Sequence, residues 1–118
     1  MDQPLALIVE DDVDASIIFS EALGAAGYRI RRALDGDAAM TQLEETTPHV
    51  VVLDLHLPGI SGEDILAHLR ATDRFARTQV IVATADPNLG EPLRERADLV
   101  MIKPISFVQL RDLAARLR

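Results

Sequence analysis

Short apolar runs separated by amphipathic segments dominate the pattern along the chain. A strand with one solvent face shows a polar residue at every second position, whereas these runs are almost continuously apolar. Such runs favour strands that are buried on both faces, as in a parallel sheet. The four strongest runs are Leu5–Val9, Val50–Leu53, Val80–Ala83 and Leu99–Ile102.

A fifth run, Tyr28–Leu34, is weaker and carries three arginines, which is typical of an edge strand. Between the runs, apolar residues recur at the spacing of helices. The first helix is predicted over Val13–Ala26 with Gly27 at its end. Serines with the spacing of helix caps, Ser61 and Ser106, precede two later helices.

The pattern is therefore a strand followed by a helix, repeated five times. It predicts one domain over residues 1–118, an α/β fold with an open parallel sheet and helices on both faces. In sheets of this kind, ligands bind beyond the carboxyl ends of the strands. The residues that end the predicted strands are therefore the first candidates for a functional site.

Composition narrows the function classes. About half of the 118 residues are apolar (48%), enough for a substantial core, and the chain has no cysteine for disulfides or thiolate metal sites. No apolar run approaches the roughly 20 residues that span a bilayer. A soluble, cytoplasmic protein without a membrane partner is expected. The net charge of −7 argues against direct contact with nucleic acid.

Charged and polar residues follow four of the predicted strands directly. Their chemistry is that of a cation and phosphate site. Glu10 and Asp11 follow the first strand, and Asp54 follows the third. Carboxylates that meet at one sheet edge repel each other unless a cation such as Mg²⁺ neutralises them. Thr84 supplies a hydroxyl for a phosphoryl oxygen and Lys103 a compact positive charge.

Each of these residues also has a purely structural interpretation. An acid at a strand end often caps the next helix, as we consider for Asp12. A lysine at such a position is often merely solvated. Lys103, however, is the only lysine among twelve basic residues, the other eleven being arginines. Because lysine and arginine are not interchangeable where a compact ammonium is required, this choice favours a specific role.

In combination, these residues resemble the receiver domains of two-component response regulators. The segments that carry the resemblance are "LIVEDD", "VVVLDLHLPGISG", "VIVATA" and "MIKPIS", in that order and over essentially the whole chain. The resemblance implies a flavodoxin-like (βα)5 fold with strand order 2-1-3-4-5. It also implies a switch that is phosphorylated on Asp54 by a histidine kinase or a histidine phosphotransfer protein in a Mg²⁺-dependent reaction, and that then changes its partner binding.

The resemblance also implies individual roles. Asp11, Asp54 and the backbone carbonyl of His56 would bind Mg²⁺, with Glu10 acting mostly through a metal-bound water. The residues that would bind the phosphoryl oxygens or act in the switch are Thr84, Ala85 and Lys103. The peptide bond between Lys103 and Pro104 would be cis. Such a domain acts only on itself, so no enzymatic activity on an external substrate is expected.

Three features depart from the family pattern. The interval between Thr84 and Lys103 is about three residues short and contains Pro87 and Pro92. A short fourth helix that begins near Pro92 is therefore expected, since proline is tolerated only in the first turn. The position of the aromatic switch residue holds Val100, and the position two after Asp54 holds His56. These departures suggest a readout other than the usual coupling between a threonine and an aromatic residue.

Two other functions stay open. One alternative is a receiver-like interaction module that does not signal by phosphate, because Val100 replaces the aromatic switch residue. A Mg²⁺-dependent phosphatase with an aspartyl nucleophile would normally have a second aspartate where His56 stands. The sequence contains no segment that we recognise as an output domain, and the output partner or fused effector is not identified.

Finally, Ile17, Ile18 and Phe19 cannot share one narrow buried stripe, so the first helix has either a wide buried face or a docking surface.

Overall fold

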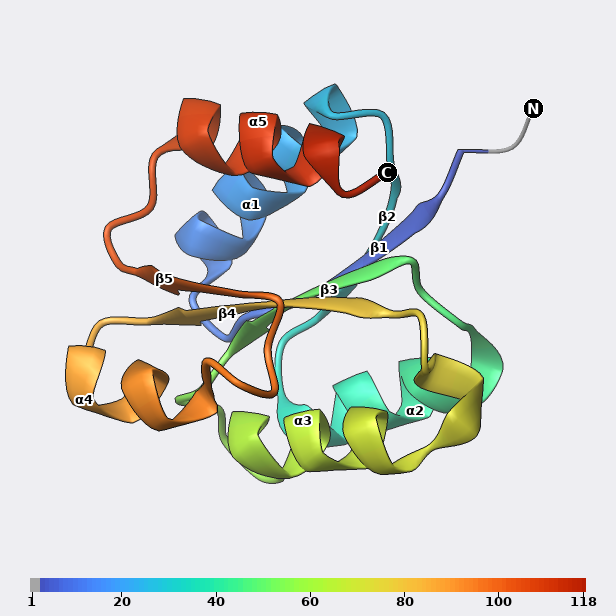
Figure 1. Ribbon diagram of the computed structural model, residues 1–118. Coiled ribbons are helices and arrows are strands. Elements are labelled where there is room, and N and C mark those ends of the chain that lie inside the picture. Colours follow the sequence, from blue (N-terminus) through green and yellow to red (C-terminus); the bar gives the residue numbers. More distant parts are fainter. Residues whose placement is uncertain (1–2) are drawn as a thin grey trace.

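The computed structural model describes residues 3–118. Within them, one parallel sheet has the strand order β2-β1-β3-β4-β5, and helices cover both of its faces (Figure 1). The strands are β1 (Leu5–Val9), β2 (Arg29–Ala33), β3 (Val50–Asp54), β4 (Gln79–Thr84) and β5 (Leu99–Ile102). The helices are α1 (Val13–Ala25), α2 (Gly36–Glu45), α3 (Gly62–Ala71), α4 (Pro87–Gly90) and α5 (Phe107–Arg116). The predicted fold class and strand order are thus confirmed.

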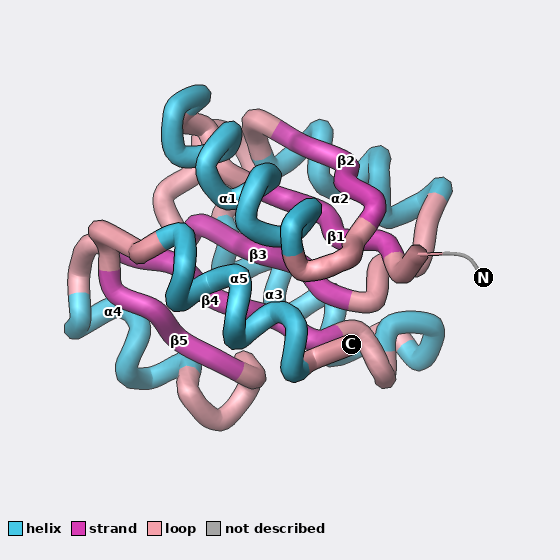
Figure 2. Tube along the Cα trace, turned by 90° about the horizontal axis from the view of Figure 1, so that it is seen from above, coloured by secondary structure: helices cyan, strands magenta, loops and turns pink. Residues whose placement is uncertain are grey.

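The helices divide into two layers. Helices α1 and α5 lie on one face of the sheet, and α2, α3 and α4 lie on the other (Figures 1 and 2). All five strands are parallel, so their carboxyl ends reach the same edge of the sheet. None of the helices described in residues 3–118 has both the length and the apolar composition needed to cross a bilayer.

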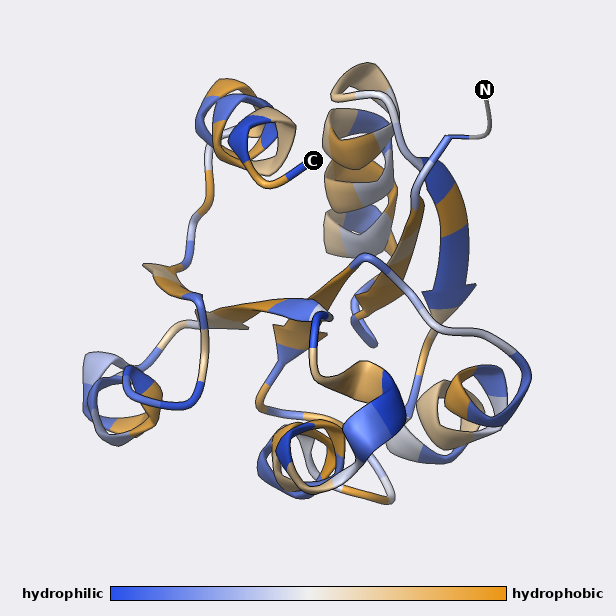
Figure 3. Cartoon of the chain, turned by 45° about the vertical axis from the view of Figure 1, so that its right-hand side comes forward, coloured by the Kyte–Doolittle hydropathy of each residue, from blue (hydrophilic) through white to orange (hydrophobic). Residues whose placement is uncertain are grey.

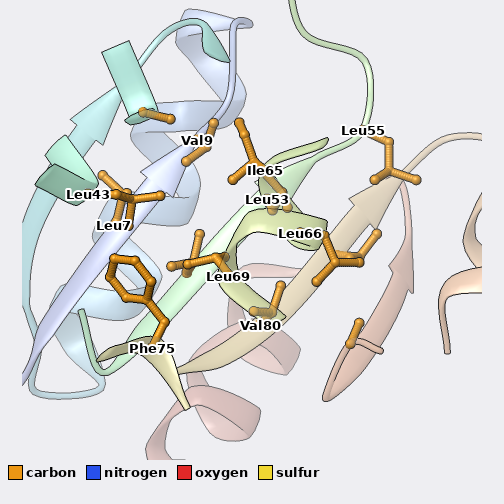
Figure 4. Packing of buried hydrophobic residues seen from close by; sticks show 14 of the residues in the cluster. Leu7, Val9, Leu43, Leu53, Leu55, Ile65, Leu66, Leu69, Phe75 and Val80 are labelled. Carbon is orange, nitrogen blue, oxygen red and sulfur yellow. The ribbon is translucent and has the colours of Figure 1, made fainter. Parts of the chain in front are cut away.

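The central strands are buried on both faces, because their successive residues point alternately into the two helical layers. In β1, Leu7 and Val9 pack with α2 and α3, whereas Ala6 and Ile8 pack with α1 and α5. Phe75 and leucines from several elements fill the first of these layers (Figure 4). The continuous apolar runs of the sequence are the direct consequence, since both faces of these strands are dry.

The edge strand β2 is more polar, as predicted from its arginines, and Figure 3 shows its hydrophilic character. It is shorter than the Tyr28–Leu34 run because Tyr28 lies outside it. The Tyr28 ring is buried beneath α5, and its hydroxyl donates a hydrogen bond of 2.8 Å to the Ala114 carbonyl oxygen. This contact links the start of β2 to the last helix.

Helix caps begin the helices where the sequence predicts them. The side chains of Ser61 and Ser106 accept hydrogen bonds from the backbone N–H groups of Asp64 and Gln109. Asp12 caps α1 in the same way through the Asp14 N–H at 3.1 Å. These caps satisfy backbone donors that the first turn of a helix leaves without an intrahelical partner.

The fourth helix is short, as expected, but its predicted start near Pro92 is wrong. It begins at Pro87, because the Asp86 side chain accepts a hydrogen bond from the Asn88 N–H and caps it. Pro87 takes the first position of the helix, where proline costs no hydrogen bond. Pro92 instead lies in the 3-10 turn Glu91–Leu93 that follows.

Two glycines shape the loop between β3 and α3. Gly59 has φ 78°, a conformation that disfavours residues with a Cβ. Gly62, the first residue of α3, lies against the end of β3. A Cβ at Gly62 would lie 2.8 Å from the Cα of Leu55 and would overlap the carbonyl oxygen of Asp54. The close approach of α3 to Asp54 therefore requires glycine at this position.

We expect Gly62→Ala to destabilise the domain by about 1–3 kcal/mol, because the extra carbon overlaps backbone that cannot move freely. Chemical denaturation monitored by circular dichroism measures the change. Gly24→Ala is the matched control, since Gly24 lies in α1 and a Cβ there would meet nothing within 4 Å. It should stabilise the domain by about 0.5–1 kcal/mol. Equal effects of the two substitutions would contradict the close approach at Gly62.

Candidate functional site

The acids named from the sequence meet at the carboxyl edge of the sheet. Glu10 and Asp11 follow β1, and Asp54 is the last residue of β3, the neighbouring strand. One carboxylate oxygen from each of the three residues lies within 4.8 Å of the others. Glu10 and Asp54 are buried, with 1% and 4% of their surface exposed, whereas Asp11 is exposed. Two of the three acids, Glu10 and Asp54, therefore lie in the interior, and Asp11 lies at the solvent-exposed side of the site.

Lys103 completes the buried part of the site. It follows β5, and its Nζ lies 2.5 Å from Glu10 Oε1 and 3.4 Å from Asp54 Oδ2. The sequence assigned Lys103 to phosphate, but it did not predict the closer pairing with Glu10. No spacing rule connects two residues 93 positions apart, and only the sheet topology brings them together. The Lys103–Pro104 peptide bond is cis.

The electrostatics of this cluster are unbalanced. Burial, and next the neighbouring Asp54 carboxylate, raise the pKa of Glu10 to about 7 although Lys103 opposes the shift. Burial lowers the pKa of Lys103, but the adjacent carboxylates of Glu10 and Asp54 outweigh this and raise it. Two buried carboxylates thus share one ammonium group. A proton or a further cation relieves the remaining negative charge.

Backbone groups orient both carboxylates. The N–H of His56 donates to Asp54 Oδ1 at 3.0 Å, and the N–H of Asp12 donates to Glu10 Oε2 at 3.3 Å. The main chain of His56 therefore lies beside the acids, while its side chain is exposed. Asp12 makes two separate contacts: its side chain caps α1, and its backbone N–H donates a hydrogen bond to Glu10.

Thr84 and Ala85 occupy the end of β4, next to β3. The Thr84 side chain is fully buried, and its Oγ1 accepts a hydrogen bond of 3.1 Å from the Asp86 N–H. Ala85 is exposed beside it. The Thr84 hydroxyl is thus linked to the residue that caps α4, and a movement of Thr84 would change the start of that helix.

Val100 lies where the resemblance would place an aromatic ring. It is half-buried on β5, beneath the backbone of Gly90 in α4. A Cβ added to Gly90 would lie 2.6 Å from a methyl carbon of Val100 and 3.2 Å from the Thr84 methyl carbon. The short fourth helix thus packs closely on β4 and β5 at Gly90, where a side chain on the helix would overlap Val100.

An apolar surface lies beside the site. Ile18, Phe19 and Ile105, from α1 and the segment after β5, line a cavity of about 470 Å³ that also includes Lys103. Ile17 and Ile18 are 40% and 44% exposed, whereas Phe19 is 4% exposed. The alternative of a wide buried face on α1 is therefore wrong, because only Phe19 of these three residues enters the core.

Comparisons with known proteins agree with this geometry. The family model of the response regulator receiver domain matches residues 6–115. The phosphate regulon transcriptional regulatory protein PhoB of Rhizobium meliloti is 33% identical over 110 residues, which cover 91% of this chain and 48% of that protein. The transcriptional regulatory protein AfsQ1 of Streptomyces coelicolor is 32% identical over 115 residues, with coverages of 98% and 50%. The chain thus spans about half the length of these relatives.

Solved structures show the same architecture. The chemotaxis response regulator CheY4 of Vibrio cholerae superimposes with a TM-score of 0.88 at 21% identity, covering 99% of this chain and 100% of that one, which supports the fold alone. The response regulator TrrA of Thermotoga maritima gives a TM-score of 0.85 at 26% identity, with coverages of 98% and 99%. From its sequence, its fold and the arrangement of its acidic site, the chain belongs to the family of response regulator receiver domains.

Proposed function

We propose that this domain is a phosphorylation-dependent signalling switch in which Asp54 accepts a phosphoryl group in a Mg²⁺-dependent reaction. The observation that carries the proposal is the buried Asp54 carboxylate, oriented by a backbone N–H and placed beside Glu10, Asp11 and Lys103. The switch acts on its own side chain. Its output is a change in partner binding.

The acids fit a magnesium ion on chemical grounds. Mg²⁺ prefers carboxylate oxygens, waters and phosphate oxygens, and Glu10, Asp11 and Asp54 offer oxygens within 4.8 Å of one another. Burial, and next the neighbouring Asp54 carboxylate, raise the pKa of Glu10, and a bound cation would offset both effects. Asp11, Asp54 and the backbone carbonyl of His56 would hold the ion, with Glu10 supporting it. When bound, Mg²⁺ would neutralise charge on the transferring phosphoryl group.

The chain's own residues account for the transfer step. An Asp54 carboxylate oxygen attacks the phosphorus of a phosphohistidine on the partner, a P–O bond forms, and the P–N bond breaks. The electron pair of that bond returns to the histidine nitrogen. Lys103 balances charge on the phosphoryl oxygens, while Thr84 and Ala85 contact them from the end of β4. Water later hydrolyses the acyl phosphate and restores Asp54.

The phosphodonor is a histidine kinase or a histidine phosphotransfer protein, and we propose that it docks on the apolar surface of α1. Ile17 and Ile18 are exposed there, and the adjacent cavity reaches Lys103 in the site. A segment of the sensor histidine kinase TmoS of Ectopseudomonas mendocina is 31% identical to this chain over 115 residues, which are 12% of that protein. A sequence similar to this chain therefore occurs within a sensor histidine kinase.

The family also supports the activation chemistry. TrrA forms a complex with Mg²⁺ and a beryllium fluoride in its solved structure, and another neighbour at 29% identity is a BeF3-activated DrrB receiver domain. PhoB and AfsQ1 are transcriptional regulatory proteins of about twice this length, so their output lies with sequence outside the matched region.

The readout is proposed to differ from a threonine–aromatic coupling. Position 100 holds valine, which packs against the backbone of Gly90 in α4, so this position has no ring that could move between α4 and β5. Thr84 instead links to Asp86, whose side chain caps α4. An interaction module without phosphate signalling would also lack the aromatic switch residue at Val100, and labelling of Asp54 separates the two functions.

Incubation with Mg²⁺ and acetyl phosphate should add one phosphoryl group to the protein, measured as intact mass. Asp54→Asn and omission of the metal should each abolish the addition. The matched control is Asp12→Asn, because Asp12 is an exposed neighbouring acid whose capping role asparagine preserves. It should label like the parent protein. A parent protein that does not label would favour the interaction module, and multiple turnover on unrelated phosphate esters would favour a phosphatase.

Magnesium affinity should depend on pH through Glu10. Its pKa of about 7 means that metal binding must displace a proton below that value. We expect the dissociation constant for Mg²⁺ to fall by about tenfold per pH unit as the pH rises towards 7, and then to level off. Titration calorimetry between pH 5.5 and 8.5, an interval of about 1.5 pH units on either side of this pKa, measures it.

The same shift predicts a stability trend without metal. The native state holds the Glu10 proton more tightly than the unfolded chain, whose ordinary value is 4.5. The contribution of Glu10 to the free energy of unfolding therefore declines as the pH rises from 4.5 to about 7. Glu10→Gln should flatten both pH profiles in this window, and unchanged profiles in this variant would assign the dependence to another group.

A further inference from the structure

A second concave site lies at the opposite edge of the sheet, where the strands begin. It is a cavity of about 510 Å³ bounded by the residues that precede β1, β3 and β4 and by the start of β2. A five-residue strand is roughly 17 Å long, so the cavity and the acidic site are separated by the length of the sheet. The proposed phosphorylation makes no use of this cavity.

The lining of this cavity has an unusual charge. Arg29, Arg74 and Arg77 contribute guanidinium groups, and the other polar side chains are those of Gln3, three threonines and His49. No aspartate or glutamate occurs among the lining residues in the described part of the chain, residues 3–118. In a protein with a net charge of −7, three cations around one cavity with no acid among its described lining residues favour a locally positive potential.

Ion pairs do not compensate these arginines. Four of the eleven arginines, namely Arg31, Arg70, Arg94 and Arg111, pair with neighbouring carboxylates. Within residues 3–118, the salt bridges of the structure include none from Arg29, Arg74 or Arg77. The Arg29 side chain donates only to the Gln3 carbonyl oxygen, which is a neutral acceptor.

Arg74 is held in place by neutral partners. Its guanidinium donates to the carbonyl oxygens of Leu43 and Thr46 and to the hydroxyl of Thr47, at 2.5, 3.0 and 3.2 Å. It also lies 4.3 Å from the centre of the buried Phe75 ring. These contacts fix the position of the group without cancelling its charge. A preorganised guanidinium loses little conformational entropy when it binds an anion.

The threonines and the histidine that line the cavity add neutral hydrogen-bonding groups to the three guanidinium groups. Thr78 is buried and anchors the wall by donating its hydroxyl hydrogen to the Pro48 carbonyl oxygen at 2.7 Å. Thr47 is exposed at the rim. Nε2 of His49 lies 2.6 Å from the Leu117 carbonyl oxygen, and a carbonyl can only accept, so this nitrogen carries the proton.

We propose that this arginine cavity binds a small polyanion that carries phosphate or carboxylate groups. Its volume lies within the range of small-molecule sites, and guanidinium groups match both anions by paired hydrogen bonds. The ligand sits on the loop between α2 and β3 and on the residues before β1 and β4. Because none of these residues belongs to the acidic site, the ligand does not contact Asp54, and its binding does not require phosphorylation there.

Inorganic pyrophosphate and citrate are the probes, titrated separately into the full chain and followed by calorimetry and by NMR shifts of backbone amides. Saturable binding should shift Thr47 and Thr78 and leave the Glu10 and Asp54 region unchanged. Preference between the two probes distinguishes a phosphate ligand from a carboxylate ligand. Arg77→Gln should weaken binding about tenfold, because one charged donor is lost.

Arg116→Gln is the matched control, since Arg116 is an exposed arginine of α5 that does not line the cavity. It removes the same charge and should change the affinity less than twofold. Equal weakening by both variants would reduce the effect to the overall charge of the surface and overturn the proposal. So would the absence of saturable binding, or binding confined to polymeric anions such as heparin.

Discussion

The site depends on one electrostatic constraint: two buried carboxylates share a single ammonium group. Glu10 and Asp54 are almost fully buried, and Lys103 lies within 3.4 Å of both. One positive charge cannot neutralise two negative charges, and burial raises the pKa of Glu10 to about 7, so the pair readily takes up a proton or another cation near neutral pH. A site with this deficit is suited to binding a metal ion and then a phosphoryl group, because each changes the local charge.

The rest of the fold keeps this arrangement in place. Glu10 follows β1, Asp54 ends β3 and Lys103 follows β5, so the parallel sheet holds the three groups through three separate strands. Gly62 allows α3 to pack directly against the backbone of Asp54. Burial of these charges is unfavourable, and it is tolerated because the dry layers on both faces of the strands supply most of the stability.

The sequence predicted the parts of this structure that are set by short-range patterns. Continuous apolar runs identified the buried strands, and serines at helical cap positions identified the starts of α3 and α5. The same patterns placed Glu10, Asp11, Asp54 and Lys103 at strand ends, and therefore at one edge. These predictions succeed because period and capping are local properties of the backbone.

Features that depend on contacts between distant segments were not predicted. The start of α4 was placed near Pro92 because proline was weighed without the competing cap at Asp86, which starts the helix at Pro87. The pairing of Lys103 with Glu10 and the contact of Gly90 with Val100 are set by tertiary packing. The excess of arginine over lysine was visible in the sequence, but only the fold shows that three arginines line one cavity.

The two edges of the sheet thus differ in the sign of their unbalanced charge. At the carboxyl edge, Glu10, Asp11 and Asp54 exceed their single cation, whereas at the amino edge Arg29, Arg74 and Arg77 have no acid among the described lining residues. Salt screens these charges within about 8 Å at physiological ionic strength, so the edges do not compensate each other across the sheet. Each edge can therefore attract a counterion of its own. The acidic edge has a cation-binding chemistry that its family explains, and the basic edge has the complementary chemistry for an anion.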